Sequence, residues 1–406
     1  MKNLITDTEN KKIDVIVKYF LPVIAGIEMN VMETYSRLAK KGWDVTIHTS
    51  KDTYLKKNHL PKLEFMRNMK IRRYPFRWYG FFPEINYQET DLVSLHNFDM
   101  FPHMHILIRA LIFKIFNRKN FKVLLTPHGG FNPEWRIFSK PQTFIKRSYH
   151  YLVANKLINL TVDGIRTVSD WEKKQMVEHG IDSRRIFTIV NGLEDEAYMD
   201  IDRSASAEIK KIVSGIGKYI LQIGRIYKIK NYETTIKALA MLPEEIKYVI
   251  AGPIQEEKRY IENLYKLING LGLKERVIFV GVIKGVDKFY LIKHAQMMVH
   301  MAIWESFCNV VHEGLSQGTV CIVANNTALS YLIKNGKNGY LAETYNTNKL
   351  AQKIRFVLNN KNKRVIKDIE SRSKKYGLEN SWDKITERIS DFYTMIVQQR
   401  LILRGF

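Results

Sequence analysis

Cysteine is scarce in this sequence, and the sequence lacks a long, continuous apolar run. The two cysteines, Cys308 and Cys321, stand in no CxxC or Cys/His metal-ligand spacing, so neither a disulfide framework nor a zinc site is predicted. The opening "MKNLITDTEN" lacks an apolar core of signal-peptide length, and the run "HILIRALIFKIF" is broken by two cations. We therefore expect a cytoplasmic protein without a membrane-spanning helix.

Acidic residues are also in short supply. There are 41 of them against 64 lysines and arginines, a net charge of +23, which attracts nucleic acid, an anionic membrane face or a phosphorylated small molecule. No helix-turn-helix, zinc-ligand or aromatic RNA-binding signature is visible, so no nucleic acid is expected as a partner.

The excess of basic over acidic residues is pronounced in residues 51–160. This segment has 19 basic and 7 acidic residues, a net +12, and includes the aromatic stretch "IRRYPFRWYGFF". Such a surface can rest on an anionic membrane, which would make the protein peripheral at the inner face. It can equally be a solvated basic face over a buried helix.

Short β-rich runs alternate with helical stretches along the whole chain, which predicts α/β architecture with parallel sheets. The polar stretch "NGLEDEAYMDIDRSASAEIKK" interrupts the pattern, which then restarts at "KYILQIG". We therefore expect two Rossmann-like domains facing a central cleft. The predicted divisions are an N-terminal domain over 1–197, a linker over 198–216, a C-terminal domain over 217–380, and a helix over 381–406 that packs back on the N-terminal domain.

Two strand ends in the first half carry residues suited to a ligand. Gly26, in "AGIE", would let the backbone approach a ligand closely, although no full GxGxxG is present. His128, in "TPHGG", follows a strand and precedes two glycines. A lone histidine is more often a packed polar residue than a catalyst, so both interpretations stay open.

The second half carries cations after one strand and carboxylates after another. Arg225 and Lys230 follow "YILQIG" and would suit a diphosphate, although a chain this basic also supplies surface cations freely. Glu305 and Glu313 enclose a helix start whose backbone, residues 306–309, favours an anion or a sugar oxygen. Carboxylates can accept hydrogen bonds from sugar hydroxyls, but a dipole-stabilised and a solvated glutamate would give the same pattern.

These motifs resemble the retaining glycosyltransferases of family 4, which have the GT-B fold. The stretches "YFLPVIAGIEMNVMETYSRLAKKGWDVTIHTS" and "LLTPHGG" are similar to the family's first-domain motifs, and "GIRTVSDWEKKQMVEHGIDSRRIFTIVNGLEDEAY" to its approach to the linker. The most specific similarity lies in "LQIGRIYKIKNYETTIKAL" and "ESFCNVVHEGLSQG", an Arg and Lys pair followed by an E-x7-E element. The family's usual motifs are altered at Ala25, Val320, Ser330 and Tyr331.

The resemblance implies a role for each matching residue. Arg225 and Lys230 would bind the donor diphosphate, and Glu313 would bind the ribose hydroxyls. The donor sugar would be bound by Glu305 together with Ser306, Phe307, Cys308 and Asn309. Gly26 would approach the phosphates, and His128 would sit near the reacting centre. The residues expected to act in catalysis are His128, Arg225, Lys230 and Glu305.

The implied activity is that of a hexosyltransferase, class EC 2.4, which needs neither metal nor cofactor. It would move a sugar with retention from a nucleotide diphosphate donor, UDP-sugar favoured, to a glycan or lipid-linked glycan in cell-surface polysaccharide synthesis. The N-terminal domain would bind the acceptor and the C-terminal domain the nucleotide sugar. A nucleotide-sugar epimerase of the same fold is the alternative, and a nucleic-acid-binding protein a weaker one.

Overall fold

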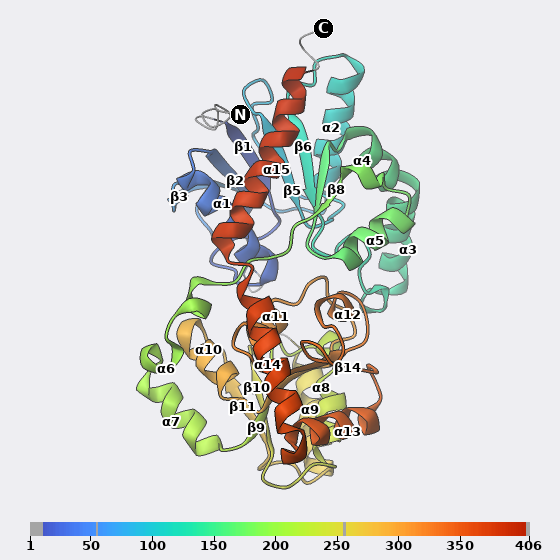
Figure 1. Cartoon of the computed structure of the whole chain (residues 1–406). Coiled ribbons are helices and arrows are strands. Elements are labelled where there is room, and N and C mark those ends of the chain that lie inside the picture. The colour runs from blue at the N-terminus through green and yellow to red at the C-terminus, as the bar shows by residue number, and fades with distance from the viewer. Residues whose placement is uncertain (1–10, 54–55, 255–256, 403–406) are drawn as a thin grey trace. The chain divides into compact units, whose positions relative to one another are not determined.

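The fold is taken from a computed structural model of the chain, in which residues 11–53, 56–254 and 257–402 are described (Figure 1). The opening "MKNLITDTEN", predicted to carry no signal peptide, lies outside these residues, as do positions 403–406 of the predicted last helix. The chain divides into two units at Asn191/Gly192, and residues from Trp382 onward belong to the first unit.

The first unit is built on an eight-stranded sheet in the order β3-β4-β2-β1-β5-β6-β7-β8. All neighbours are parallel except β3, which runs antiparallel to β4. The strands are β1 (Lys12–Ile16), β2 (Asp44–Ser50), β3 (Leu63–Met66), β4 (Met69–Tyr74), β5 (Leu92–His96), β6 (Lys122–Thr126), β7 (Gly164–Thr167) and β8 (Ile186–Thr188).

Helices cover both faces of this sheet. They are α1 (Gly26–Lys40), α2 (His103–Ile115), α3 (Lys140–Ser148), the π-helix η2 (Tyr149–Ala154), α4 (Asn155–Thr161), α5 (Asp170–Glu178) and α15 (Trp382–Ile402), with 3-10 turns η1 (Trp135–Ile137) and η3 (Ser183–Arg185). One core joins Val15 to α1 and α15, and a second joins Ile16 to α2, α4 and α5. Neighbouring residues of β1 thus feed opposite cores, as the strand period requires.

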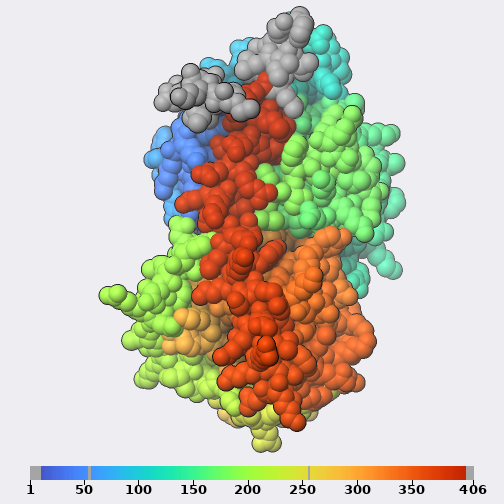
Figure 2. Space-filling view, viewed as in Figure 1, coloured from blue at the N-terminus to red at the C-terminus, as the bar shows by residue number. Residues whose placement is uncertain are grey.

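Helix α15 is part of the first unit. Its apolar face, which includes Ile385, Ile389 and Phe392, is buried in the core shared with α1. Figures 1 and 2 show it (red) lying across the first unit between the blue N-terminal elements and the green segment that includes α4 and α5.

The second unit has a six-stranded, fully parallel sheet in the order β11-β10-β9-β12-β13-β14. Its strands are β9 (Tyr219–Ile223), β10 (Lys247–Ala251), β11 (Val277–Gly281), β12 (Met297–His300), β13 (Cys321–Ala324) and β14 (Tyr340–Ala342). Its helices are α6 (Ile201–Ser204), α7 (Ala207–Ile216), α8 (Tyr232–Leu239), α9 (Lys258–Gly270), α10 (Gly285–Lys293), α11 (Asn309–Ser316), α12 (Leu329–Leu332), α13 (Thr347–Leu358) and α14 (Lys363–Leu378), with 3-10 turns η4 (Asp195–Tyr198), η5 (Lys228–Lys230) and η6 (Asn360–Asn362).

The predicted linker, residues 198–216, differs from the structure. It forms α6 and α7 and belongs to the second unit, which already begins at Gly192. Helix α7 buries Ile209 and Val213, and the side chain of Ser206, its N-cap, donates a hydrogen bond of 2.8 Å to Asp287 of α10. The polar composition that suggested a linker therefore belongs to the solvent face of an amphipathic helix.

Two further features were not predicted. The strands β3 and β4 are short and rich in charged residues, although their apolar residues alternate with charged ones, and β14 has only three residues. Among the described residues, none of the helices is long and apolar enough to cross a bilayer.

Candidate functional site

The predicted cations and carboxylates of the second unit come together at one edge of its sheet. Arg225 and Lys230 follow β9, Glu305 follows β12, and these two strands are hydrogen-bonded neighbours although they are far apart in sequence. Each loop leaves the carboxyl end of its strand, and because the strands are parallel these two ends lie at the same edge of the sheet. Open α/β sheets bind ligands at this edge.

Backbone groups approach closely at this edge. A Cβ atom added to Gly252, at the end of β10, would lie 1.9 Å from the carbonyl oxygen of Gly224, and Gly252 has a φ of +154°. Only glycine fits such an approach. The tight packing sets the direction in which the chain leaves β9 toward Arg225.

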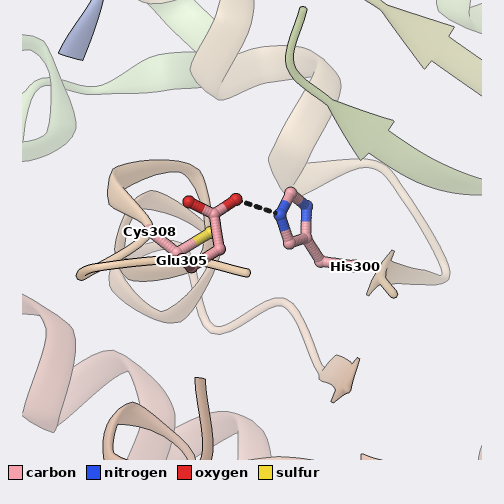
Figure 3. Close-up of side chains that lie close together, drawn as sticks. All are labelled: His300, Glu305 and Cys308. Carbon is pink, nitrogen blue, oxygen red and sulfur yellow. Dashed lines mark hydrogen bonds and ion pairs between the residues drawn. The ribbon is translucent and has the colours of Figure 1, made fainter. Parts of the chain in front are cut away.

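Lys230, Glu305 and His300 form a buried cluster. The Lys230 ammonium is ion-paired with Glu305 Oε1, and His300 Nε2 lies 2.8 Å from the same oxygen. Figure 3 shows the Glu305 carboxylate facing the His300 ring, with the Cys308 sulfur beside it. The side chains of Lys230 and Glu305 are 14% and 12% exposed, so solvent screens this pair little.

The cluster keeps both ionisable partners charged. Burial opposes ionisation of Glu305, but the Lys230 ammonium and the His300 hydrogen bond lower its pKa to about 2. Burial alone would lower the pKa of Lys230, yet the Glu305 carboxylate raises it above its usual value. For His300 burial prevails and lowers the pKa, so the ring stays neutral at physiological pH.

Asn231 connects the loop after β9 to the loop after β12. It adopts a left-handed conformation with φ +51°, and its Nδ2 donates hydrogen bonds of 2.9 Å to the carbonyl oxygens of Met301 and Thr344. The backbone N–H of Ile303 donates to the Ile229 carbonyl over 2.8 Å. The positions of Lys230 and Glu305 are therefore determined by main-chain contacts as well as by their own ion pair.

The residues expected to hold the donor sugar form the start of α11. Ser306 and Phe307 lie in the loop, and Cys308 caps the helix with a φ of +79°, which is unusual for a residue other than glycine. Asn309 is the first residue of α11. The positive end of the helix dipole thus lies beside Glu305, as the sequence pattern predicted.

Glu313, one turn inside α11, contacts Lys288 of α10. Its Oε1 lies 3.1 Å from Lys288 Nζ, which also lies 2.9 Å from Glu194 Oε2. Burial raises the pKa of Glu313, and Lys288 counteracts the shift. Within the described part of the chain, the buried Oε2 atom of Glu313 has no hydrogen-bond partner. A buried carboxylate oxygen without a donor is costly, so this atom is suited to a hydroxyl of a ligand.

The described residues include one three-ligand grouping with metal-site spacing. The ligand atoms of His300, Glu305 and Cys308 lie within 4.8 Å of one another, although the sequence spacing had suggested no zinc site (Figure 3). The Lys230 ammonium already contacts the central carboxylate. A divalent cation on these ligands would have to displace it, and burial keeps the Cys308 thiol protonated by raising its pKa.

Two predicted residues lie in the first unit. Gly26 starts α1, and an added Cβ would meet nothing within 4 Å, so the backbone there is open to a ligand. His128 lies in the turn after β6 with a φ of +49°, and its Nε2 is 2.9 Å from Nδ1 of His96. His96 Nε2 in turn lies 2.7 Å from the hydroxyl of Tyr35.

Burial keeps these histidines neutral. The pKa of His128 is lowered to about 3 by burial and by the Arg166 guanidinium. The pKa of His96 is lowered well below its usual value by burial and by the neighbouring His128, Arg166 and His103. His128 is therefore suited to hydrogen bonding rather than to carrying a positive charge.

Glu172 of α5 supports the turn that carries His128. One carboxylate oxygen accepts the backbone N–H of Gly129, and the other accepts that of Val168 over 2.9 Å. Burial raises the pKa of Glu172 to about 7, against the opposing effect of these two donors and of Arg166.

A cavity of about 690 Å³ opens where β13 and β14 end. Thr344 lines it and also accepts the hydrogen bond from Asn231. None of the predicted site residues is among its lining residues, which are Asn325, Glu343, Thr344, Tyr345, Asn346, Thr347 and Asn348.

Sequence reasoning missed several residues that support this edge. His300 is the last residue of β12 and looked like strand interior, and Lys288 stood among many other lysines. His96 likewise ends β5. The sequence signal that could have identified the two histidines is their position. Each is the last residue of a strand, at the edge of the sheet where ligands bind.

Two family models match the chain. The family model described as "Glycosyltransferase Family 4" matches residues 24–197, and that described as "Glycosyl transferases group 1" matches residues 206–375. The chain belongs to the family 4 glycosyltransferases. It is thus a nucleotide-sugar-dependent glycosyltransferase of class EC 2.4.

The relatives of this glycosyltransferase have low sequence identity to it, but the similarity extends over much of the chain. An uncharacterized glycosyltransferase of Methanocaldococcus jannaschii is 22% identical, over 93% of this chain and 97% of its own length. A Campylobacter jejuni enzyme named N-acetylgalactosamine-N,N'-diacetylbacillosaminyl-diphospho-undecaprenol 4-alpha-N-acetylgalactosaminyltransferase is 26% identical, over 61% of this chain and 66% of its own.

The solved structures confirm the predicted fold. Anabaena HepE, crystallised with UDP and glucose, superimposes with a TM-score of 0.71 at 18% identity, covering 95% of this chain and 100% of its own. WaaG, a glycosyltransferase involved in lipopolysaccharide biosynthesis, gives 0.66 at 15% identity, covering 94% and 99%. The two α/β units therefore form a GT-B fold.

Proposed function

We propose that this enzyme transfers a sugar with retention from a UDP-sugar to a glycan or lipid-linked glycan in cell-surface polysaccharide synthesis. The observation that carries the proposal is the Lys230 and Glu305 ion pair at the carboxyl ends of β9 and β12, with Arg225 in the same loop as Lys230. It combines fixed positive charge for a diphosphate with a carboxylate for hydroxyl groups.

Each donor group is assigned a partner in the second unit. Arg225 and Lys230 bind the diphosphate, and the start of α11, residues 306–309, binds the sugar together with Glu305. The buried Glu313 Oε2 accepts a ribose hydroxyl, which supplies the donor that this oxygen lacks among the described residues. In the first unit, Gly26 is assigned to the phosphates and His128 to the sugar.

The proposed chemistry is displacement at the anomeric carbon. The bond from this carbon to the diphosphate oxygen breaks, an acceptor hydroxyl forms the new bond on the same face, and its proton passes to the departing diphosphate. Charge on the leaving oxygen increases during the step, so Arg225 and Lys230 stabilise the transition state more than the ground state. We propose that these side chains meet the charge without a metal or cofactor.

Two relatives support the choice of donor and acceptor. UDP and glucose occupy the Anabaena HepE crystal, and the name of the Campylobacter enzyme specifies a diphospho-undecaprenol acceptor. The basic residues of 51–160 are proposed to hold the protein at the inner, anionic face of the membrane. The cytoplasm is then the source of the donor.

Two assays on the purified protein test this function. It is incubated with UDP-, GDP-, ADP- and dTDP-sugars, and release of nucleoside diphosphate is measured. The anomeric configuration of the sugar at the moment of its release is then identified by NMR, before the sugar interconverts between its two anomers. Release of UDP with the anomer of the donor supports the proposal. Inversion, or preference for another base, contradicts the corresponding part.

The epimerase alternative predicts a different product, a nucleotide sugar that stays intact with one altered stereocentre. Neither this alternative nor nucleic-acid binding is retained, because both family models and the named relatives are glycosyltransferases.

A further inference from the structure

Helix α3 of the first unit lies at the margin of this unit and has no buried residue (Figure 1). Phe144 and Ile145 are 74% and 57% exposed. The exposed apolar series continues into the π-helix η2, where Leu152 is 68% exposed and Tyr151 48%. Monomeric proteins rarely expose such a contiguous group of large apolar side chains without a partner.

The exposed series is attached to the body of the unit at its far end. His150 and Ala154 are buried, and the His150 ring packs edge-on against Phe131 with centroids 4.3 Å apart. Leu157 and Ile158 of α4 enter the core. The helical segment over residues 140–154, here called the docking helix, is therefore a folded element held in place by its C-terminal part.

Its charge has a single sign. From residue 135 to residue 162 the sequence has no acidic residue and five basic ones, Arg136, Lys140, Lys146, Arg147 and Lys156. Arg136 is ion-paired over 2.7 Å with Glu134, just before this stretch, so the other four carry the net positive charge. Two of these cations lie against aromatic rings, Lys146 at 4.7 Å from the Phe138 ring and Arg147 at 5.0 Å from the Trp135 ring. Apolar, aromatic and cationic groups are thus interleaved on one surface.

We propose that the docking helix lies on an anionic phospholipid bilayer, with Phe144, Ile145 and Leu152 among the acyl chains. The cations around it then contact lipid headgroups, and the two contributions reinforce each other. A second copy of this chain fits poorly, because a two-fold interface would place the same basic surface on both sides. A purely polar polyanion would leave the apolar side chains exposed.

The place of the docking helix in the chain links it to the proposed reaction. It follows the His128 turn through η1, within the connection between β6 and β7. Docking therefore holds the bilayer near the strand-end loops of the first unit, where the proposed function places the acceptor. The inference rests on that function only for this consequence, because lipid binding itself needs no transfer.

Sedimentation with vesicles tests the docking helix. The full chain is mixed with phosphatidylcholine vesicles with or without phosphatidylglycerol, at low and physiological salt. We expect binding to the anionic vesicles, weakened roughly tenfold or more by Phe144→Ser with Ile145→Ser and, separately, by Lys146→Gln with Arg147→Gln. Matched controls in the second unit are Phe356→Ser with Val365→Ser, and Lys363→Gln with Arg364→Gln; both should bind like the wild type.

Three results would overturn the inference. They are wild-type protein that stays in the supernatant under all conditions, equal loss in the control variants, and a dimer in light scattering that Phe144→Ser with Ile145→Ser dissociates. Calorimetric titration with UDP is run on the same samples. A protein that binds UDP but no vesicle retains the proposed donor site, and refutes the docking helix together with the proposed membrane attachment through residues 51–160.

Discussion

His300 Nε2 and Glu305 Oε1 are 2.8 Å apart, and the same carboxylate oxygen contacts the Lys230 ammonium. An ionised carboxylate only accepts hydrogen bonds, so Nε2 carries the ring proton. Because burial lowers the pKa of His300, the ring is a neutral donor. His300 therefore orients Glu305, and through Glu305 it positions Lys230.

Loss of this hydrogen bond should impair turnover. We expect His300→Leu to lower kcat roughly tenfold, because Glu305 and Lys230 lose their fixed orientation. His300→Gln places an amide N–H near the position of Nε2 and should retain most of the activity. Steady-state kinetics with a UDP-sugar measures both. If the two variants fall equally while their thermal unfolding matches the wild type, His300 does not act through its donor.

Removal of either cation after β9 should affect catalysis more strongly. Arg225→Ala and Lys230→Ala should each lower turnover roughly 100-fold or more, since each removes charge opposite the leaving diphosphate. Lys228→Ala is the matched control, because Lys228 lies in the same loop and its side chain is exposed. Thermal unfolding is recorded as well, because Lys230→Ala leaves the buried Glu305 carboxylate without its ion-pair partner. Near wild-type turnover in a folded variant would remove that cation from the donor site.

Substitution of Glu313 should act on donor affinity. Glu313→Gln should raise the donor KM several-fold and change kcat less, since a ribose contact differs little between ground and transition states. Glu194→Gln is the control, because Glu194 shares Lys288 with Glu313 but is not assigned to the ligand. Calorimetric titration with UDP gives the affinity directly. Equal UDP affinity in wild type and Glu313→Gln would restrict Glu313 to a structural role.

Glu172 should make stability depend on pH. Below its ordinary pKa of 4.5 the carboxyl is protonated in folded and unfolded chains alike. Between pH 4.5 and about 7 the unfolded chain has lost this proton while the folded chain retains it, so the folded state loses stability as pH rises. The loss should be on the order of 1 to 3 kcal/mol.

Denaturant unfolding at several pH values isolates this contribution. Glu172→Gln cannot titrate, so the free energy of unfolding of the variant should decrease less between pH 4.5 and 7 than that of the wild type. Parallel curves for the two proteins would show that Glu172 has the same pKa in the folded and unfolded chains.

The sequence predicted the fold class and the strand-end positions, because apolar runs and loop residues are local signals. Arg225, Lys230 and Glu305 were placed correctly after their strands. Their meeting depends on β9 and β12 being neighbours in the sheet, which no local pattern encodes. The resemblance to a known family supplied that link.

Four features of the structure could not be predicted from local sequence patterns. Residues 198–216 look polar in sequence because only one face of α7 is buried. The role of His300 depends on a partner five residues away in a turn, and that of Lys288 on a carboxylate in another helix. The exposure of α3 could not be predicted, because the two adjacent apolar residues Phe144 and Ile145 do not show from sequence which side of the helix faces solvent.

The central claim is that Arg225 and Lys230 bind the diphosphate of a nucleotide donor, and comparison of nucleoside diphosphate with monophosphate binding tests it most directly. Calorimetric titrations with UDP and UMP, and with the guanine and adenine pairs, are run on wild type, Arg225→Ala, Lys230→Ala and the control Lys228→Ala. We predict that wild type and control bind UDP at least tenfold more tightly than UMP, and that this preference shrinks toward unity in the other two variants. An unchanged preference in Arg225→Ala and Lys230→Ala would contradict the account.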